Sequence, residues 1–245
     1  MYGTGQLNPT WVKEKSNASP LLKSANVGTW GNVAEKASTG RAVARRVLTE
    51  GAVVVCADIQ ANLAEETAEV LRSEFGKDAA VGVAVDITNR ESVQQLYAAA
   101  ALRYGGLDTI VIVAAVFFAP DEAGNLPDAL FRKTFDVNVY GSFVAADEGA
   151  KALLRQGTGG DIVLVSSANA LVAKKGSIAY DTSKTAVNHL VRELAVTYAP
   201  SIRVNAVAPG AIATDFGVSR WEDLMPYAAG AFALFGLASL PAGRL

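Results

Sequence analysis

The sequence contains a single cysteine and a single histidine. One cysteine excludes an intrachain disulfide and any zinc site built on two or four cysteines, and we expect no metal site. Cys56 lies in the apolar run AVVVCAD with no base evident nearby, so we expect a buried packing thiol. His189 falls in the helical pattern KTAVNHLVRELAV, and no GxSxG turn precedes any serine. We therefore place His189 on a helix face rather than in a hydrolase triad.

The sequence also lacks an excess of either charge and any long apolar run. The 22 Lys and Arg residues against 24 Asp and Glu residues give a net charge of −2, which provides no general basic field for a nucleic acid or an anionic membrane. No stretch of about 18 apolar residues occurs, and the polar N-terminus lacks the apolar middle region of a signal peptide. We expect a soluble cytoplasmic protein that binds neither nucleic acid nor a membrane.

What is present is enough apolar material for a core, since 51% of the 245 residues are hydrophobic. This length and composition fit one globular domain. Residues 1–26 show no clear period and are rich in Asn, Ser, Lys and Gly, which indicates a polar N-terminal extension. We assign residues 27–245 to a single domain.

Helical and strand patterns alternate from Gly40 onward. GRAVARRVLTEG predicts a helix that ends at Gly51, and the continuous apolar run AVVVCAD predicts a strand covered on both faces. The further predicted elements are helices near 63–75, 89–104, 128–155 and 180–198 and the strands AAVGVAVD, TIVIVAA, DIVLVSS and IRVNAVAPG.

Two of these helices carry a capping signal, because Asn62 and Glu65, and likewise Thr88 and Glu91, have the spacing of a capping box. Repeated strand and helix units with buried apolar strands predict a single Rossmann-like α/β domain with a doubly wound parallel sheet in three layers. Such sheets bind ligands at the carboxyl ends of their strands, so functional residues should follow strands.

Tyr180 and Lys184 are one helical turn apart, so both project from one face, where the ammonium favours the phenolate. Ser167 closes the strand DIVLVSS 13 residues before Tyr180. Asn138 lies 29 residues before Ser167. A phenol beside a cation is suited to proton transfer.

In these residues the sequence resembles the short-chain dehydrogenase/reductase family, whose members carry an Asn, a Ser at a strand end and a Tyr-x-x-x-Lys at about these separations. The resemblance spans about Ser38 to Thr214. Further matches to the family pattern are Asp58 at the end of the second predicted strand, Asp86-Ile87 at the end of the third, and Pro209-Gly210 with Thr214 after IRVNAVA.

The resemblance implies a role for each member of the first group. Tyr180 would be the general acid in reduction and the general base in oxidation, with Lys184 lowering the pKa of its phenol and hydrogen-bonding the nicotinamide ribose. Ser167 would donate to the substrate oxygen, where negative charge develops. Asn138 would bind a water that continues the proton path.

The resemblance also implies a nicotinamide dinucleotide, and Asp58 favours NAD because its carboxylate accepts from ribose hydroxyls and repels a 2′-phosphate. Lys36 weakens that preference slightly, because a basic residue in the phosphate loop is placed to meet a 2′-phosphate. Asp86-Ile87 resembles the adenine-contacting pair, and Thr214 the residue that meets the nicotinamide amide. The implied cofactor contacts are Ser38, Gly40, Asp58, Asp86, Ile87, Ala114, Tyr180, Lys184, Pro209, Gly210 and Thr214.

The phosphate loop departs from the family pattern. Aligned on Gly40, the family's TGxxxGxG becomes VAEKASTG, so Ala34 and Ser38 replace the first two glycines. A Cβ at Ala34 strains the turn, and Ser38 occupies phosphate space although its hydroxyl can donate to a phosphate. Glu35 adds negative charge beside the anion. We expect weakened cofactor affinity.

Three other segments depart from the pattern. SANVGTWGNV, before the loop, has two glycines and two asparagines, which disfavour a buried strand. The family's Asn-Asn-Ala-Gly, which lines the cofactor cleft, is replaced by IVAA at residues 112–115. No strand with the family's closing pattern follows Thr214, so we expect an edge strand to be missing.

Two hypotheses follow. In the first, the protein is an NAD(H)-dependent oxidoreductase that interconverts a secondary alcohol and its carbonyl. In the second, it is a dehydrogenase-like protein that no longer binds a dinucleotide and acts as a binding or assembly partner. We favour the first, because a chain without catalytic activity has no chemical need for Asn138, Ser167, Tyr180, Lys184 and Asp58 together.

A few segments of the sequence give indirect indications of the substrate and of the oligomeric state. Phe117, Phe118, Trp221 and Met225 would flank the pocket in this family. SANALVA, from Ser167, resembles the dehydrogenase part of aldolase-dehydrogenase fusion proteins of deoxysugar breakdown, which suggests a small polyol or hydroxyaldehyde. The helices near 128–155 and 180–198 form the dimer contact in relatives, so we expect a homodimer or homotetramer.

Overall fold

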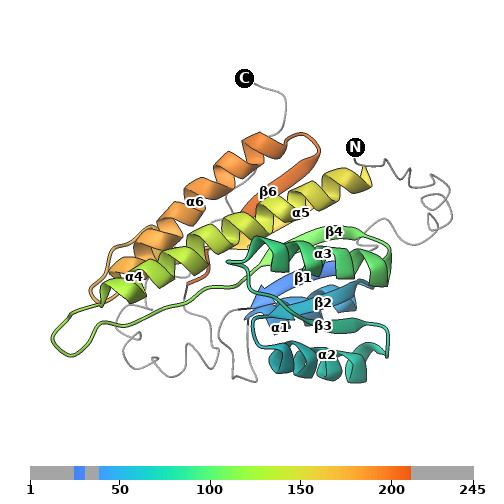
Figure 1. Ribbon diagram of the computed structural model, residues 1–245, viewed down its shortest axis with the longest axis horizontal. Coiled ribbons are helices and arrows are strands. Elements are labelled where there is room, and N and C mark those ends of the chain that lie inside the picture. Colours follow the sequence, from blue (N-terminus) through green and yellow to red (C-terminus); the bar gives the residue numbers. More distant parts are fainter. Residues whose placement is uncertain (1–24, 31–38, 211–245) are drawn as a thin grey trace.

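The structure is a computed structural model that describes residues 25–30 and 39–210 (Figure 1). Its sheet has six strands, all parallel, in the order β3-β2-β1-β4-β5-β6. The strands are β1 (Ala25–Trp30), β2 (Val53–Asp58), β3 (Ala80–Ala84), β4 (Leu107–Ile112), β5 (Gly160–Val165) and β6 (Ile202–Val207). The helices are α1 (Thr39–Thr49), α2 (Ala61–Phe75), α3 (Arg90–Tyr104), α4 (Asp128–Phe135), η2 (Asp136–Gly141), α5 (Ser142–Gln156), η3 (Ala168–Ala170) and α6 (Ile178–Tyr198).

The helices cover both faces of the sheet. Helices α1 and α2 pack on β1, β2 and β3 from one side, whereas α3 and α5 pack on the other, with α6 beside α5 and against β6 (Figure 1). The chain order reverses between β1 and β4, which lie next to each other. The predicted doubly wound α/β fold in three layers is confirmed.

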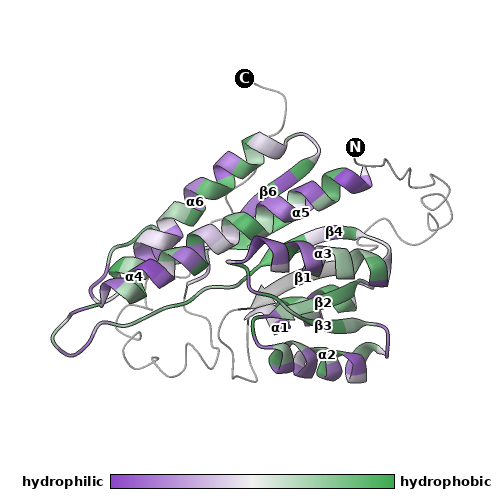
Figure 2. Ribbon diagram, in the orientation of Figure 1, coloured by the Kyte–Doolittle hydropathy of each residue, from purple (hydrophilic) through white to green (hydrophobic). Residues whose placement is uncertain are grey.

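Strand β2 shows why its sequence is a continuous apolar run. Val54 and Cys56 belong to the cluster under α1 and α2, while Val55 and Ala57 belong to the cluster on the opposite face. Both faces are therefore buried, and Figure 2 shows the hydrophobic colouring of this strand. The free thiol of Cys56 lies at 0% exposure, and burial raises its pKa to about 12. Such a thiol is a packing group, as predicted.

The glycines and asparagines of SANVGTWGNV are expected to disfavour a buried strand, but Ala25–Trp30 of this segment form strand β1. It lies in the middle of the sheet, and Gly28 is in register with Cys56 of β2 on one side and Val111 of β4 on the other. Backbone pairing along both edges holds this segment as a strand despite its glycine and asparagine content. The strand begins at Ala25, two residues before the domain start that we placed at residue 27.

The long helix predicted over 128–155 consists of three joined segments. Helix α4 continues without a break into the π-helical turn η2 and then α5, and the backbone at Phe135, Asp136 and Ser142 stays right-handed helical. A π turn inserts one extra residue per turn and shifts the faces that follow it. Asn138 lies in this turn.

The two predicted capping boxes are wrong by one or two residues. Helix α2 starts after Gln60, which makes no side-chain cap, so Asn62 is inside the helix. Helix α3 is capped by Asn89, whose side chain accepts from the Ser92 backbone N–H. The hydroxyl of the neighbouring Thr88 instead donates to Asp86.

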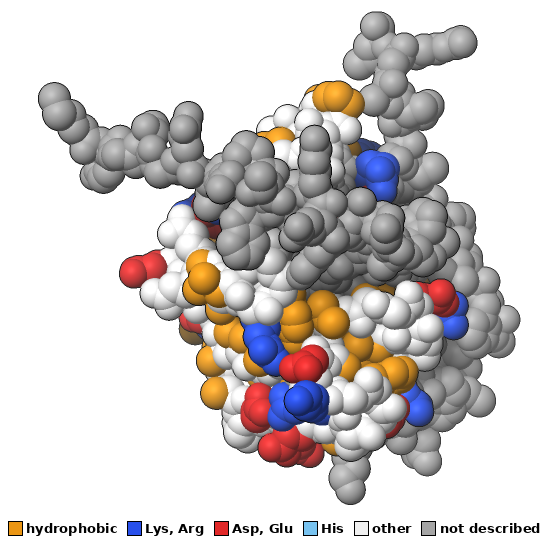
Figure 3. All heavy atoms as spheres, turned by 90° about the vertical axis from the view of Figure 1, so that its right-hand side faces the viewer, with side chains coloured by type: hydrophobic (Ala, Val, Ile, Leu, Met, Phe, Trp, Pro, Cys, Tyr) orange, Lys and Arg blue, Asp and Glu red, His pale blue; other side chains and the backbone are white. Residues whose placement is uncertain are grey.

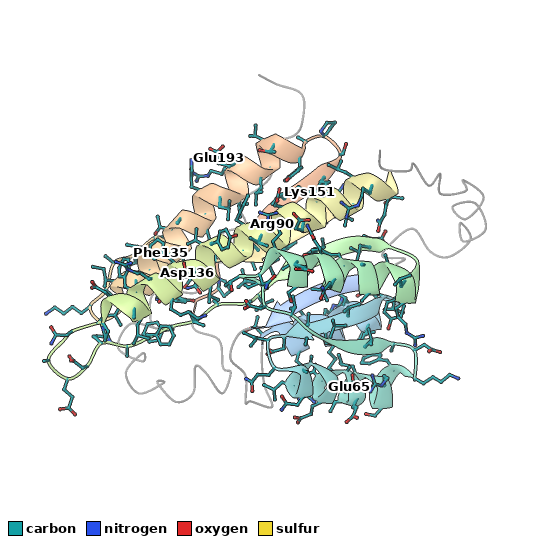
Figure 4. The ribbon with its side chains drawn as sticks, viewed as in Figure 1. Glu65, Arg90, Phe135, Asp136, Lys151 and Glu193 are labelled. Atoms are coloured by element: carbon teal, nitrogen blue, oxygen red, sulfur yellow. The ribbon has the colours of Figure 1, made fainter. Side chains whose placement is uncertain are left out.

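A group of charged and polar side chains ties α3, α5 and α6 together, and we refer to it as the charge cluster. Arg90 of α3 contacts both Asp147 and Glu148 of α5, and Lys151 donates to the same two carboxylates at 2.7 and 2.9 Å. The Tyr198 hydroxyl of α6 donates to Asp147 at 2.6 Å. Arg90 and Lys151 are labelled in Figure 4. Both carboxylates are buried, and both accept hydrogen bonds from charged side chains.

Charges of both signs are interspersed on the surface seen in Figure 3, where Lys and Arg side chains lie close to Asp and Glu side chains. Arg203 and Asp161 form an ion pair, with a nitrogen and an oxygen atom 2.6 Å apart. Among the described helices, none combines the length and apolar character needed to cross a membrane.

Candidate active site at the carboxyl edge of the sheet

The polar residues singled out in the sequence follow the carboxyl ends of neighbouring strands. Asp58 is the last residue of β2, and its backbone oxygen accepts from Val85, just after β3, at 2.8 Å. The segments after β5 and β6 are also joined, since Ala168 donates its N–H to Pro209 at 2.9 Å and Ser166 to Val207 at 2.8 Å. One edge of the sheet therefore carries both groups of predicted residues.

Tyr180 and Ser167 meet at this edge. Ser167 has an extended backbone after β5 and caps η3, and Tyr180 lies in the first turn of α6. Burial raises the pKa of Tyr180, and a hydrogen bond between the two side chains acts in the opposite direction without cancelling that rise. The ring of Phe117, from the segment after β4, meets the Tyr180 ring edge to face with centroids 5.5 Å apart. The predicted neighbours Phe117, Ser167 and Tyr180 are thus in contact.

Lys184 is buried at 2% exposure beneath this pair. Its ammonium donates to the Val165 carbonyl at 2.7 Å and lies 5.6 Å from the centre of the Tyr180 ring. Burial lowers the pKa of Lys184 to about 8. The hydrogen bond to the end of β5 therefore fixes the Lys184 ammonium beside Tyr180.

The expected lowering of the tyrosine pKa by this cation is not found. Burial raises the pKa of Tyr180, the Ser167 hydrogen bond opposes that rise, and the Asp181 charge adds to it. The physical reason is that removal of the phenol from water penalises its anion more than the nearby donors stabilise it. The direction is therefore the reverse of the sequence expectation.

The side chain of Asn138 makes three hydrogen bonds to other parts of the chain. Its side-chain oxygen accepts from the Val116 backbone N–H at 2.8 Å, and its amide nitrogen donates to the Val116 carbonyl at 3.0 Å and to Ser183 Oγ at 2.9 Å. Both amide hydrogens are used. Asn138, at 0% exposure, thereby fastens the segment after β4 to α6.

Sequence reasoning missed Ser183 and Asp181, although both lie inside the Tyr180–Lys184 motif. Ser183 accepts from Asn138 and donates to the Tyr180 carbonyl at 2.7 Å. The available signal was their place within one turn of Tyr180, since residues three or four apart share a helix face. The spacing along the chain does not show which side chains contact Ser183 and Asp181.

On the cofactor side, Asp58 is 3% exposed and its Oδ1 accepts from the Gln60 backbone N–H at 2.9 Å. Burial raises the pKa of Asp58, while the backbone N–H groups of Gln60 and Ile59 lower it. Gly40 is buried in the first turn of α1. A carboxylate at the end of β2 beside a glycine-started helix suits a nucleotide ribose and the phosphate that follows it.

The remaining described residues of this group line the same edge. Asp86 uses Oδ1 to accept from the backbone N–H and the hydroxyl of Thr88, at 2.8 and 2.7 Å. Ile87 and Ala114 are buried at 6% and 5% exposure, and a Cβ added to Gly141 would lie 2.7 Å from the Ile87 side chain. Pro209 is half-buried and Gly210 is exposed.

Several predictions concern residues outside the described ranges. These are the polar extension, the altered phosphate loop with Ala34, Lys36 and Ser38, and the expected missing edge strand with Thr214, Trp221 and Met225. Within the described ranges, no group of His, Cys, Asp and Glu side chains is arranged to hold a metal ion.

Comparison with known proteins identifies the class to which this site belongs. The family model described as short chain dehydrogenase matches residues 34–225. The chain therefore belongs to the short-chain dehydrogenase/reductase family, and it is an oxidoreductase of the kind that acts on alcohols or carbonyls. Proteins of this family bind a nicotinamide dinucleotide, which the residues at the described edge fit.

Individual relatives agree with this assignment. An NAD-dependent glycerol dehydrogenase of Listeria innocua is 31% identical over 183 residues, covering 74% of this chain and 69% of the relative. The oxidoreductase YuxG of Bacillus subtilis is 33% identical over 195 residues, and the match takes up 75% of this chain but 27% of the relative. A short-chain type dehydrogenase/reductase from Mycobacterium marinum has a similar structure, with a TM-score of 0.75 at 28% identity over 84% of this chain and 80% of that one.

Proposed function

We propose that this protein is an NAD(H)-dependent oxidoreductase that interconverts a secondary alcohol and its carbonyl, with Tyr180 as the group that gives and takes the proton. The observation that carries this proposal is the contact of Tyr180 with Ser167 above the buried Lys184, at the sheet edge that also bears Asp58. When bound, the nicotinamide supplies the hydride acceptor or donor for the reacting carbon.

Each residue has a defined task in the reaction. In reduction, the Tyr180 hydroxyl donates its proton to the carbonyl oxygen of the substrate, and in oxidation the phenolate removes it from the alcohol. Ser167 donates a hydrogen bond to the same oxygen, where negative charge grows. Lys184 holds the end of β5 through Val165 and places a positive charge under the ring.

Asn138 takes a positioning role in this proposal. It binds both polar backbone groups of Val116, one residue before Phe117, and it also binds Ser183, three residues after Tyr180. Phe117 in turn packs on the Tyr180 ring. The amide therefore fixes the wall of the pocket relative to the acid/base group, and a change at Asn138 would disturb both.

Asp58 sets the choice of cofactor. A carboxylate at the end of β2 accepts hydrogen bonds from the two ribose hydroxyls and repels a 2′-phosphate, which favours NAD over NADP. The name of the Listeria innocua relative includes the same dependence. That relative acts on glycerol, and together with the segment SANALVA it supports a small polyol or hydroxyaldehyde as the substrate of this protein. We place the protein in the cytoplasm.

The alternative, a dehydrogenase-like protein that does not bind a dinucleotide, rests on the glycines lost at Ala34 and Ser38. Titration with NADH and NADPH, followed by cofactor fluorescence and calorimetry, separates the two functions. We expect saturable binding that prefers NADH and weakens about tenfold or more in Asp58→Ala, the effect of losing hydrogen bonds to a charged group. No binding at millimolar cofactor by a folded sample would favour the alternative.

Activity is then measured on a panel of polyols, hydroxyaldehydes and simple secondary alcohols. Tyr180→Phe should lower kcat by roughly 10²- to 10⁴-fold with cofactor affinity largely kept, because only the proton-transfer group is removed. Tyr104→Phe, at the end of α3, is the matched control and should retain full activity. A Tyr180→Phe protein with wild-type kcat would contradict the assignment.

A further inference from the structure

The ring of Phe117, from the segment that follows β4, is in direct contact with the proposed acid/base tyrosine. The centroids of the Phe117 and Tyr180 rings are 5.5 Å apart, and the two ring planes make an angle of 81°. In this edge-to-face arrangement the positive edge of one ring meets the negative face of the other, so the pair has a preferred angle as well as a preferred distance. The contact therefore restrains the plane of the Tyr180 ring.

The plane of a phenol ring decides in which direction its proton can move. The O–H bond lies in the ring plane, because a lone pair of the oxygen is shared with the ring electrons. The hydrogen bond between Ser167 and Tyr180 holds the phenol oxygen, but a single bond at that atom leaves the ring free to turn about its own long axis. Lys184 adds a cation 5.6 Å from the ring centre, whereas Phe117 adds a contact with a defined interplanar angle.

Phe117 is itself held in place, because Asn138 binds the backbone of the preceding residue. The side-chain oxygen of Asn138 accepts from the Val116 N–H at 2.8 Å, and its amide nitrogen donates to the Val116 carbonyl at 3.0 Å. Residues 112–115 are Ile, Val, Ala and Ala, whose side chains cannot hydrogen-bond. The Asn138 amide is therefore the polar anchor beside Phe117.

The same amide is joined to the helical turn that carries Tyr180. Asn138 donates to Ser183 Oγ at 2.9 Å, and the Ser183 hydroxyl donates to the Tyr180 carbonyl at 2.7 Å. Asn138 and Ser183 are both at 0% exposure, so water does not compete for these bonds. The ring and the backbone of Tyr180 are thus held relative to one amide. We refer to Val116, Phe117, Asn138 and Ser183 as the tyrosine clamp.

We propose that Phe117 is a positioning residue, which fixes the plane of the Tyr180 ring by meeting it edge to face and so sets the direction in which the phenol gives or takes its proton. This inference rests on the proposed function for its catalytic meaning. A group that orients the acid/base residue acts on the rate of the chemical step, so its loss should lower kcat rather than raise KM.

The first test is the rate at which the Tyr180 ring flips, measured by NMR on protein with ¹³C-labelled tyrosine, which needs neither cofactor nor substrate. The Tyr180 signals are those that disappear in Tyr180→Phe. In Phe117→Leu, which keeps an apolar side chain but removes the ring, the flip rate should rise by roughly 2- to 10-fold, the range that corresponds to the energy of an aromatic pair. Phe117→Tyr keeps the ring and should keep the slow flip. An unchanged flip rate in a folded Phe117→Leu protein overturns the proposal.

Where the enzyme turns over, the kinetic constants give a second readout. In Phe117→Leu, kcat should fall by roughly 2- to 10-fold with KM nearly unchanged, and Phe117→Tyr should restore kcat. A Phe117 ring that serves only as a wall of the substrate pocket would raise KM and leave kcat as it is, and this result would reject the positioning role. If no cofactor binds, the proposed function fails, but the ring-flip measurement still decides whether Phe117 holds the tyrosine.

Phe75→Leu is the matched control. Phe75 is also a half-buried phenylalanine, and it lies at the end of α2, where it packs on the cluster under α1 and α2. The same substitution there should change neither the flip rate of Tyr180 nor kcat.

A double variant tests whether the clamp places the ring of Phe117. Ser183→Ala removes the bond that joins Asn138 to α6. Combined with Phe117→Leu, it should raise the flip rate no further than the more affected single variant does, because both changes release the same ring. Increases that multiply would show that the two groups act independently, and they would overturn the placement of Phe117 by the clamp.

Discussion

At the scale of single residues, the most informative feature of this protein is the buried ammonium group of Lys184. Lys184 is buried, and its hydrogen bond to Val165 only partly replaces the water it has lost. Burial therefore lowers its pKa from 10.5 to about 8. The lysine destabilises the folded protein while it is protonated, and a cost of this kind is typical of groups kept for function.

This lowered pKa predicts how stability depends on pH. Below pH 8 both the folded and unfolded chains carry the Lys184 proton, whereas from 8 to 10.5 the unfolded chain holds more of it, so stability rises with pH. Between roughly pH 7 and pH 9.5 the wild type should gain about 2 kcal/mol in free energy of unfolding relative to Lys184→Met. Urea unfolding at both pH values measures the difference.

Lys77→Met is the control, because Lys77 lies at an exposed position. The difference in free energy of unfolding between the wild type and this variant should not change with pH in this way. Groups that titrate alike in wild type and variant cancel in the comparison. Parallel pH profiles for the wild type and Lys184→Met would mean that the buried amine keeps an ordinary pKa.

At the scale of the secondary-structure elements, the charge cluster holds α5 between α3 and α6. Burial acts to raise the pKa values of Asp147 and Glu148, but hydrogen bonds from Lys151, from Arg90 and from Tyr198 or Gln94 outweigh it and lower both. Carboxylates whose pKa is lowered stabilise the fold above their ordinary pKa and lose this effect as the pH falls. The cluster should therefore support the helix layer at neutral pH and weaken in acid.

Arg90→Gln tests this role. With Arg90 removed, two buried carboxylates share Lys151 alone as their cation, so the free energy of unfolding at neutral pH should fall by ~1–3 kcal/mol. The deficit should begin to shrink as the pH falls below the ordinary carboxyl pKa values of 3.8 and 4.5, and it should be lost below the lowered values, where both groups are protonated in the folded wild type as well. Chemical denaturation across this pH range provides the measurement.

Arg45→Gln breaks an exposed ion pair with Glu74 and serves as the matched control. It should cost less than ~1 kcal/mol at any pH, because water and salt screen an exposed pair. Equal losses for Arg90→Gln and Arg45→Gln would show that the cluster does not hold the helices together.

At the scale of the whole molecule, we predict a homodimer or homotetramer that pairs through the α4–α5 and α6 helices. Tyr140 and Val196 expose 48% and 75% of their surfaces on these elements. Light scattering should give a mass above one chain, and Tyr140→Glu or Val196→Glu should shift the equilibrium toward the monomer, because a charge in an apolar contact is costly.

Leu102→Glu is the control for that experiment. Leu102 is 89% exposed on α3, which is not one of the predicted contact helices, and a charge there should not change the mass. A wild-type protein that remains a strict monomer at high concentration would contradict the predicted assembly.

The fold class and the family could be predicted from the sequence alone. Apolar runs such as β2 are long enough to predict buried strands, and the spacing from Ser167 to Tyr180 and Lys184 resembles a family pattern that the matching family model confirms. These signals are local or depend on spacing along the chain, so they can be read without knowing the neighbours in space.

The tertiary structure alone decided the rest. Strand β1 exists because two neighbouring strands pair with it, and the N-caps of α2 and α3 fall where the chain enters its packed position. The direction of the Tyr180 pKa depends on burial first, and then on the Ser167 hydrogen bond and the Asp181 charge. Desolvation and the partner of each polar group are properties of the packed chain, so no sequence spacing reports them.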